Sequence, residues 1–169
     1  MKTWLCITNP YNWKIVKENG TWGVDDRYEI TIRNNCNEND VLVFYVLKNI
    51  KPAVRMLIEN MNFDIHDLEN IEQSKGCFVG IYRIVGDYQH SNEQLGWINR
   101  KGETTTFPHR RAIELDIEPI HPIPLNPTTD LFNDLYFIAD KSRSWYSLLY
   151  ASMVLISDND LAVFRNICN

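Results

Sequence analysis

Apolar and polar positions along the chain form patterns that predict both strands and helices. Four runs are rich in aliphatic or β-branched residues and are bounded by turn-forming residues, so we expect strands at 4–8, 41–47, 77–86 and 111–117. In the last run, Ile113, Leu115 and Ile117 alternate with acidic residues, which is the pattern of a half-buried strand. That phase places Arg111 on the apolar side of the strand and Arg110 on its polar side.

Short helices are predicted between these runs. A turn at Asn9-Pro10 precedes a helix over residues 12–18, because proline biases the residue before it away from helical backbone. Gly20 is expected to end this helix. Two further short helices are predicted at 52–60 and 64–73.

The second half of the chain contains a connector and a capped helix. Four prolines fall within 118–128, so this segment is predicted to be extended. Ser157 is a candidate N-cap, with Asp160 at the third helical position as in a capping box. Leu161 and Phe164 then continue as an apolar stripe, which predicts a helix packed on the core.

Length and composition favour one packed domain over residues 1–169. A chain of 169 residues with 44% apolar and 12% aromatic residues can bury one sizeable core. No apolar run reaches the 18 residues that a membrane span needs, so we expect no membrane partner. The four cysteines lack metal-type spacing, and a reducing, cytoplasmic location fits them best. We expect a monomer without metal or cofactor.

Tryptophans and asparagines gather near the start of the chain. The segments WLCITNPYNW (4–13) and GTWGV (20–24) bring Asn9, Trp13 and Trp22 close to one end of the first predicted strand. Aromatic faces beside amide groups can bind a flat heteroaromatic ring. The alternative is a buried aromatic cluster, which composition alone favours, since tryptophan is more often a core residue.

The same segments closely resemble the opening of the EVE domain family, a PUA-like family related to YTH domains. Further similarities are NDVLVFYV (39–46), GIYRIV (80–85), FPHRRAI (107–113), and LYFI (135–138) followed by Trp145. The chain departs from the family pattern at Asn39, Arg83, Arg111 and Ala112. Residues 48–76 are longer than in many members, which indicates an insertion.

The resemblance implies an α+β fold, a PUA-like bent β-barrel with peripheral helices, and recognition of a modified base in DNA or RNA. Such a base must be single-stranded or flipped out before its faces can be contacted. On this basis we expect a base-binding pocket. Its walls would be Trp22, Trp97 and Tyr45, its polar groups Asn9 and the backbone at Gly23 and Val24, and its support Trp13.

Positive charge is scarce, so any phosphate contact must be local. The net charge of −5 argues against non-specific coating of nucleic acid. The densest cations are Arg100, Lys101, Arg110 and Arg111, which we predict to be the phosphate-binding group. From sequence, either Arg110 or Arg111 could face the ligand.

Two other functions compete with the base reader. A small molecule or nucleotide metabolite could occupy the same pocket, and the acidic net charge is compatible with this alternative. An enzyme acting on modified nucleosides is less favoured. The sequence contains no G-x-S-x-G motif, no phosphate-binding glycine loop and no zinc deaminase signature, so we expect no catalysis.

Overall fold

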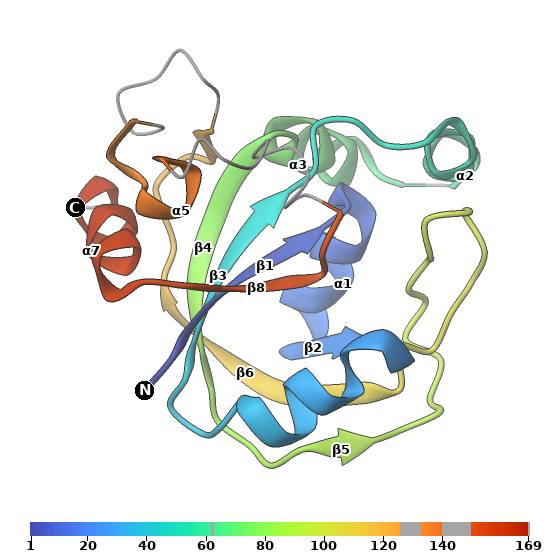
Figure 1. The fold of residues 1–169 in the computed structure, drawn as a ribbon. Helices are drawn as coiled ribbons and strands as arrows, with labels where there is room; N and C mark the ends of the chain where they lie inside the picture. Colours follow the sequence, from blue (N-terminus) through green and yellow to red (C-terminus); the bar gives the residue numbers. More distant parts are fainter. Residues whose placement is uncertain (62, 126–132, 140–149, 169) are drawn as a thin grey trace.

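The computed structural model describes residues 1–61, 63–125, 133–139 and 150–168 (Figure 1). The chain runs through β1 (Thr3–Thr8), α1 (Pro10–Asn19), β2 (Thr21–Val24), a 3-10 turn (Asp26–Tyr28), a π-helical turn (Thr31–Asn35), β3 (Val41–Val46), α2 (Pro52–Asn60) and α3 (Ile65–Ser74). It continues through β4 (Cys77–Ile84), β5 (Gln89–His90), β6 (His109–Ile117), β7 (Ile123–Pro124), α5 (Tyr136–Ala139), β8 (Met153–Ile156) and α7 (Asp158–Ile167). Trp145 lies outside the described residues.

One mixed sheet organises these elements, with strand order β2-β6-β4-β3-β1-β8. The sheet is antiparallel except for β1 and β3, which pair in parallel from Thr3↔Val41 to Thr8↔Val46. Figure 1 shows that the sheet curls into an open half-barrel, with β6 and β2 turned towards α1. The two edge strands, β2 and β8, therefore border an open seam. Near that seam, the Ser152 N–H donates to the Tyr28 hydroxyl at 2.9 Å.

The two faces of the sheet bury different clusters. On one face, Trp13 of α1 contacts Phe44 and Tyr82, with ring centroids 5.1 and 5.7 Å apart. On the other face, Phe164 of α7 packs on Phe78 at 4.8 Å. Because successive residues of β3 point to opposite faces, this strand supplies both clusters and is buried along its whole length. Trp13 is thus part of the core.

The predicted helices, the helix end at Gly20 and the cap at Ser157 agree with the structure, and Asn9 supplies a further cap that was not predicted. Asn9 caps α1, since its side-chain oxygen accepts the Asn12 N–H at 2.7 Å, and Gly20 ends the helix with a φ of 57°. Ser157 and Asp160 form the predicted capping box at the start of α7. Residues 48–76 form α2 and α3 and flanking turns; the insertion and the single domain remain predictions.

The strand predicted at 111–117 is β6, and its predicted alternation of inward and outward side chains fails after Leu115. Ile117 pairs with Ile81 and Leu115 with Tyr82, so Asp116 is an extra residue that forms a bulge. The bulge changes the face on which Ile117 lies: Ile113 belongs to the cluster around Trp13, whereas Ile117 packs against the cluster around Phe164. Leu115, which lies before the bulge, is 49% exposed. No helix in the described part of the chain is both long enough and apolar enough to cross a membrane.

Candidate functional site

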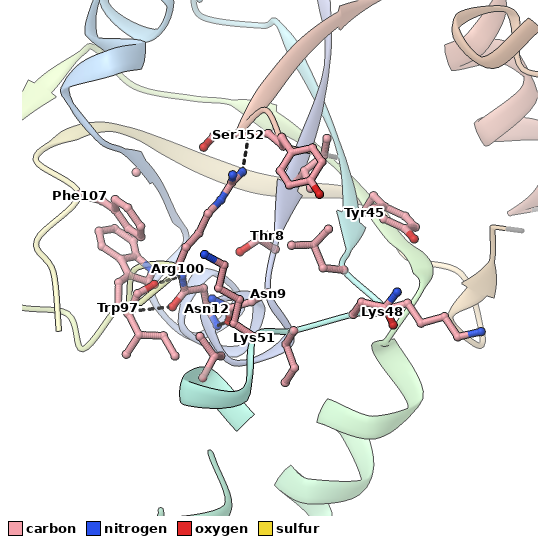
Figure 2. Close-up of a pocket in the computed structure, with 18 of the residues that line it drawn as sticks. Thr8, Asn9, Asn12, Tyr45, Lys48, Lys51, Trp97, Arg100, Phe107 and Ser152 are labelled. Carbon is pink, nitrogen blue, oxygen red and sulfur yellow. Dashed lines mark hydrogen bonds between the residues drawn. The ribbon is translucent and has the colours of Figure 1, made fainter. Parts of the chain in front are cut away.

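A cavity of about 760 Å³ opens at the seam of the half-barrel, beside the carboxyl ends of β1 and β3 (Figure 2). Both edges of the sheet contribute to it, through Trp22 and Gly23 of β2 and through Ser152 just before β8. The loop that precedes β6 and the segment between β3 and α2 form the remaining walls. This volume lies within the range of about 300–1,000 Å³ that is usual for small-molecule and cofactor sites.

Aromatic residues line the cavity, among them Trp22, Trp97 and Tyr45; their role in binding a base stays a prediction. Phe107 was not predicted, and its ring lies 5.6 Å from that of Trp97. Trp97 and Trp22 are only 1% and 5% exposed, so each ring also packs on the protein behind it. The structure therefore shows aromatic walls, without an open pair of parallel rings.

Gly23 allows the Trp97 ring to pack directly against β2. A Cβ at this position would lie 2.8 Å from Cη2 of Trp97 and 2.9 Å from the Phe107 carbonyl oxygen. Any side chain would have to displace the ring or the loop. The predicted role of Gly23 was backbone hydrogen bonding to a base; its observed role is to permit this close contact.

Asn12, which was not among the predicted residues, holds the Trp97 loop in place. Its amide donates to the Ile98 carbonyl at 2.8 Å and accepts the Ile98 N–H at 2.9 Å. Both bonds are buried, and they join α1 to a segment 86 residues away. Since Trp97 is the adjacent residue, this pair of bonds fixes the position of its ring.

Asn9 lines the cavity, as predicted, but its oxygen is already used to cap α1. Its amide nitrogen is the group left to contact a ligand, because no hydrogen bond from that nitrogen to another described residue is present. Asn9 can therefore act as a donor to a ligand acceptor. Thr8 lies beside it in the cavity (Figure 2).

Val24 and Trp13 do not line this cavity. Val24 is 1% exposed and pairs with His109 in the sheet, while Trp13 lies in the core described above. Their backbone geometry supports Gly23 and Asn9, respectively, but neither side chain is placed to contact a ligand there.

Arg110 and Arg111 are both buried, whereas the predicted phase of the strand placed Arg110 on its polar side. The Arg110 guanidinium donates to the carbonyls of Phe107, Glu93 and Thr106, and it lies 4.9 Å from the centre of the Trp97 ring. Burial lowers its pKa. Its geometry supports the cavity wall from behind and leaves it poorly placed to hold a phosphate.

The Arg111 guanidinium has a similar structural environment. It donates to the carbonyls of Ile32, Arg33 and Cys36 in and after the π-helical turn, and to that of Gly86. The bond to Cys36 is 2.6 Å long. These contacts tie the turn to β6, so Arg111 also lacks a free edge for a phosphate.

Among the residues that the structure describes, three cations line the cavity: Lys48, Lys51 and Arg100. Only Arg100 belongs to the predicted phosphate-binding group; it donates to the Tyr150 carbonyl and lies 5.7 Å from the centre of the Tyr150 ring. Lys101 is exposed but does not line the cavity. Among the described lining residues there is no acid, although the whole chain has a net charge of −5.

Comparison with known proteins identifies relatives over almost the whole chain. The EVE domain pattern matches residues 2–159. The UPF0310 protein PYRAB08750 of Pyrococcus abyssi is 29% identical over 168 residues, which cover 99% of each chain. The UPF0310 protein PH1033 of Pyrococcus horikoshii is 30% identical over 143 residues, covering 85% of this chain and 82% of its own.

Solved structures with the same fold include two nucleic-acid complexes. Human THYN1, in complex with DNA containing 5-methylcytosine, is 10% identical with a TM-score of 0.56, and 99% of this chain and 97% of that chain are covered. The YTH domain of Zygosaccharomyces rouxii MRB1, in complex with N6-methyladenosine RNA, is 10% identical with a TM-score of 0.52, covering 99% and 88%. These similarities confirm the predicted PUA-like α+β fold.

Proposed function

Because the chain belongs to the EVE domain family, we propose that it is a binding module for a modified base of DNA or RNA. The observation that carries the proposal is the cavity itself: aromatic walls, a free amide donor at Asn9, and three cations with no acid among the described lining residues. Flat walls can stack on a base, and base–aromatic stacking contributes about 1–3 kcal/mol per base. The two neighbouring complexes, with methylated DNA and methylated RNA, support the same class of ligand.

Recognition in this cavity requires an unpaired or flipped-out nucleotide, because a base within a duplex shows neither face. The amide nitrogen of Asn9 would donate to a ring nitrogen or carbonyl oxygen at the base edge. A methyl group would add about 0.8 kcal/mol through burial of one carbon. Selectivity for that group therefore depends on a close fit to the cavity wall.

We propose binding rather than catalysis. Among the described lining residues, the ionisable side chains are lysines, an arginine and tyrosines, and the set includes no carboxylate or imidazole to act as a general acid or base. Incubating modified nucleosides with the protein and following them by chromatography tests this point. Conversion of any nucleoside would contradict it.

A binding screen tests the proposed function. Single-stranded and duplex oligonucleotides, each with and without 5-methylcytosine or N6-methyladenosine, are titrated at one fixed salt concentration. We expect a modified single strand to bind more tightly than its unmodified counterpart, and Asn9→Ala to weaken this preference. Equal affinity for modified and unmodified strands across the panel would contradict the proposal.

A nucleotide metabolite remains the second candidate, because the cavity volume suits a free small molecule. Salt dependence separates the two candidates. A polynucleotide releases counterions on binding, so its affinity falls as salt rises, whereas an uncharged nucleoside shows little change.

A further inference from the structure

The segment between β3 and α2 places two lysines at the cavity. Lys48 and Lys51 both line it, and both are exposed. Within the described part of the chain, neither forms an ion pair or a side-chain hydrogen bond. By contrast, Lys14, Lys17 and Lys75 each pair with a glutamate. The charges of Lys48 and Lys51 are thus not neutralised by described carboxylates.

The stem of Lys48 is held by packing. Gly76 has a φ of 75°, and a Cβ built there would lie 3.1 Å from Cβ of Lys48. The backbone N–H of Gly76 also donates to the Val46 carbonyl at 2.9 Å, which fixes the end of β3 beside it. Lys48 therefore leaves the protein from a defined position, even though its ammonium group is exposed.

Arg100, the third cation, lies across the cavity from Lys48. Figure 2 shows Arg100 and Lys48 on opposite sides, with Thr8 and Asn9 between them. Arg100 comes from the loop before β6, whereas Lys48 and Lys51 come from the segment after β3. A nucleotide inserted between these flanks would have one cationic group near each of its neighbouring phosphates.

We propose that Lys48 and Lys51 hold the phosphodiester backbone of a single strand, with Lys48 on the flank opposite Arg100, so that the strand crosses the mouth of the cavity. The proposal rests on the proposed function, because it takes the nucleotide in the cavity as given. It assigns phosphate contact to Lys48 and Lys51 in place of Arg110 and Arg111, whose guanidinium groups are buried. The ligand class it identifies is a polynucleotide with phosphates on both sides of the recognised base.

The test compares two double variants with the same loss of charge. Lys48→Gln/Lys51→Gln removes both proposed contacts, and glutamine keeps the part of the Lys48 stem that packs on Gly76. The control, Lys17→Gln/Arg55→Gln, removes two exposed cations that do not line the cavity. Lys51 is the N-cap of α2 and Arg55 lies one turn further along this helix. Removing the charge of Arg55 therefore reports the effect of a lower net charge close to Lys51. Matching melting temperatures establish that each variant is folded.

Each protein is titrated with three ligands that share one base: a modified nucleoside, its 3′,5′-bisphosphate, and a single-stranded oligonucleotide. The set is made with 5-methylcytosine in DNA and with N6-methyladenosine in RNA. For the wild-type protein, we expect the bisphosphate to bind more tightly than the nucleoside. In Lys48→Gln/Lys51→Gln that gain is reduced to the part that Arg100 supplies, and the salt slope for the oligonucleotide falls by about 1.4, at about 0.7 for each phosphate contact on a single strand.

The outcomes distinguish this inference from the proposed function. If the nucleoside still binds but phosphates add nothing, or if both double variants lose affinity equally, the lysine contacts are disproved and base recognition stands. If no nucleoside, bisphosphate or oligonucleotide binds, both proposals fail. A smaller phosphate gain in Lys48→Gln/Lys51→Gln, but not in the control variant, supports the inference.

Discussion

Gly23 shows how closely a single residue controls the shape of the cavity. Its missing side chain allows the Trp97 ring to approach β2, and a methyl group there would lie 2.8 Å from that ring. We expect Gly23→Ala to reduce the free energy of unfolding by roughly 1–3 kcal/mol through overpacking. Ligand affinity should also fall, because the Trp97 wall must move. Chemical denaturation and titration of one oligonucleotide measure the two effects.

Gly86→Ala is the matched control for this change. A Cβ at Gly86 would approach the Cβ of Ala112 at 3.2 Å, away from the cavity. Its effect should be confined to stability. If both variants bind the oligonucleotide as well as the wild-type protein does, then the position of Trp97 does not control binding.

Asn12 offers a second test at the residue scale. Asn12→Ala leaves the buried N–H and carbonyl of Ile98 without their partners, and each unsatisfied group costs roughly 1–3 kcal/mol. We expect a loss of about 2 kcal/mol in unfolding free energy and weaker ligand binding. Asn19→Ala, which removes an exposed bond to the Ile15 carbonyl, should change stability by less than about 0.5 kcal/mol. Equal losses in the two variants would contradict a special role for Asn12.

At the scale of elements, Arg111 joins parts of the chain that are far apart in sequence. It links the π-helical turn and the end of β4 to β6 through four carbonyl oxygens. Lysine cannot reproduce the planar arrangement of guanidinium donors. We expect Arg111→Lys to destabilise the protein by roughly 3 kcal/mol, because several charged hydrogen bonds are lost.

Arg83→Lys is a suitable comparison, since Arg83 forms an exposed ion pair with Asp116 at 2.9 Å. Exposed pairs contribute about 0–1 kcal/mol, so this change should have little effect. Thermal unfolding of both variants decides the matter. A loss of less than 1 kcal/mol for Arg111→Lys would show that the turn is held by other contacts.

Elements defined by local signals could be predicted from the sequence, whereas those defined by distant partners could not. Gly20 and Ser157 mark helix ends through bonds to nearby backbone groups, and these predicted caps are confirmed. Strands β2 and β8 are short edge strands whose hydrogen bonds come from β6 and β1. No local pattern identified them as strands.

The same difference between local signals and distant partners applies to the residues of the candidate site. Trp22, Tyr45 and Trp97 line the cavity as predicted from the family resemblance, and Asn9 lies beside them. The burial of Arg110 and Arg111 could not be predicted, because their guanidinium groups are held by backbone carbonyls of other loops and turns, which no local pattern reveals. Lys48 and Lys51 had no distinctive spacing, and they were recognised only once the fold placed them at the cavity.

For the molecule as a whole, buried thiols make stability sensitive to alkaline pH. Burial raises the pKa of Cys36 from 9.0 to about 12, with Asp40 adding to the effect, and burial also raises the pKa values of Cys6 and Cys77. These thiols ionise near pH 9 when unfolded but stay neutral to higher pH when folded. The unfolded state therefore loses protons first, and the free energy of unfolding should fall as pH rises above about 9.

Denaturant titrations at a series of alkaline pH values measure this fall. For Cys36 the loss should accumulate between about pH 9 and about pH 12, the two limits set by its unfolded and folded pKa. Cys36→Ala should show a shallower decline than the wild-type protein. Parallel curves for the two proteins would mean that this thiol does not contribute.

The pairing of β1 with both β3 and β8 determines the order in which strands can join the sheet during synthesis. Thr3 pairs with Val41, in the first third of the chain, and with Ile156, more than 100 residues later. During synthesis, β1 and β3 are available to one another well before β8 is made. Until then the apolar β1 has an unpaired edge, which is a template for association with other chains. Joining of the last strand is therefore the step at which a nascent chain becomes protected from aggregation.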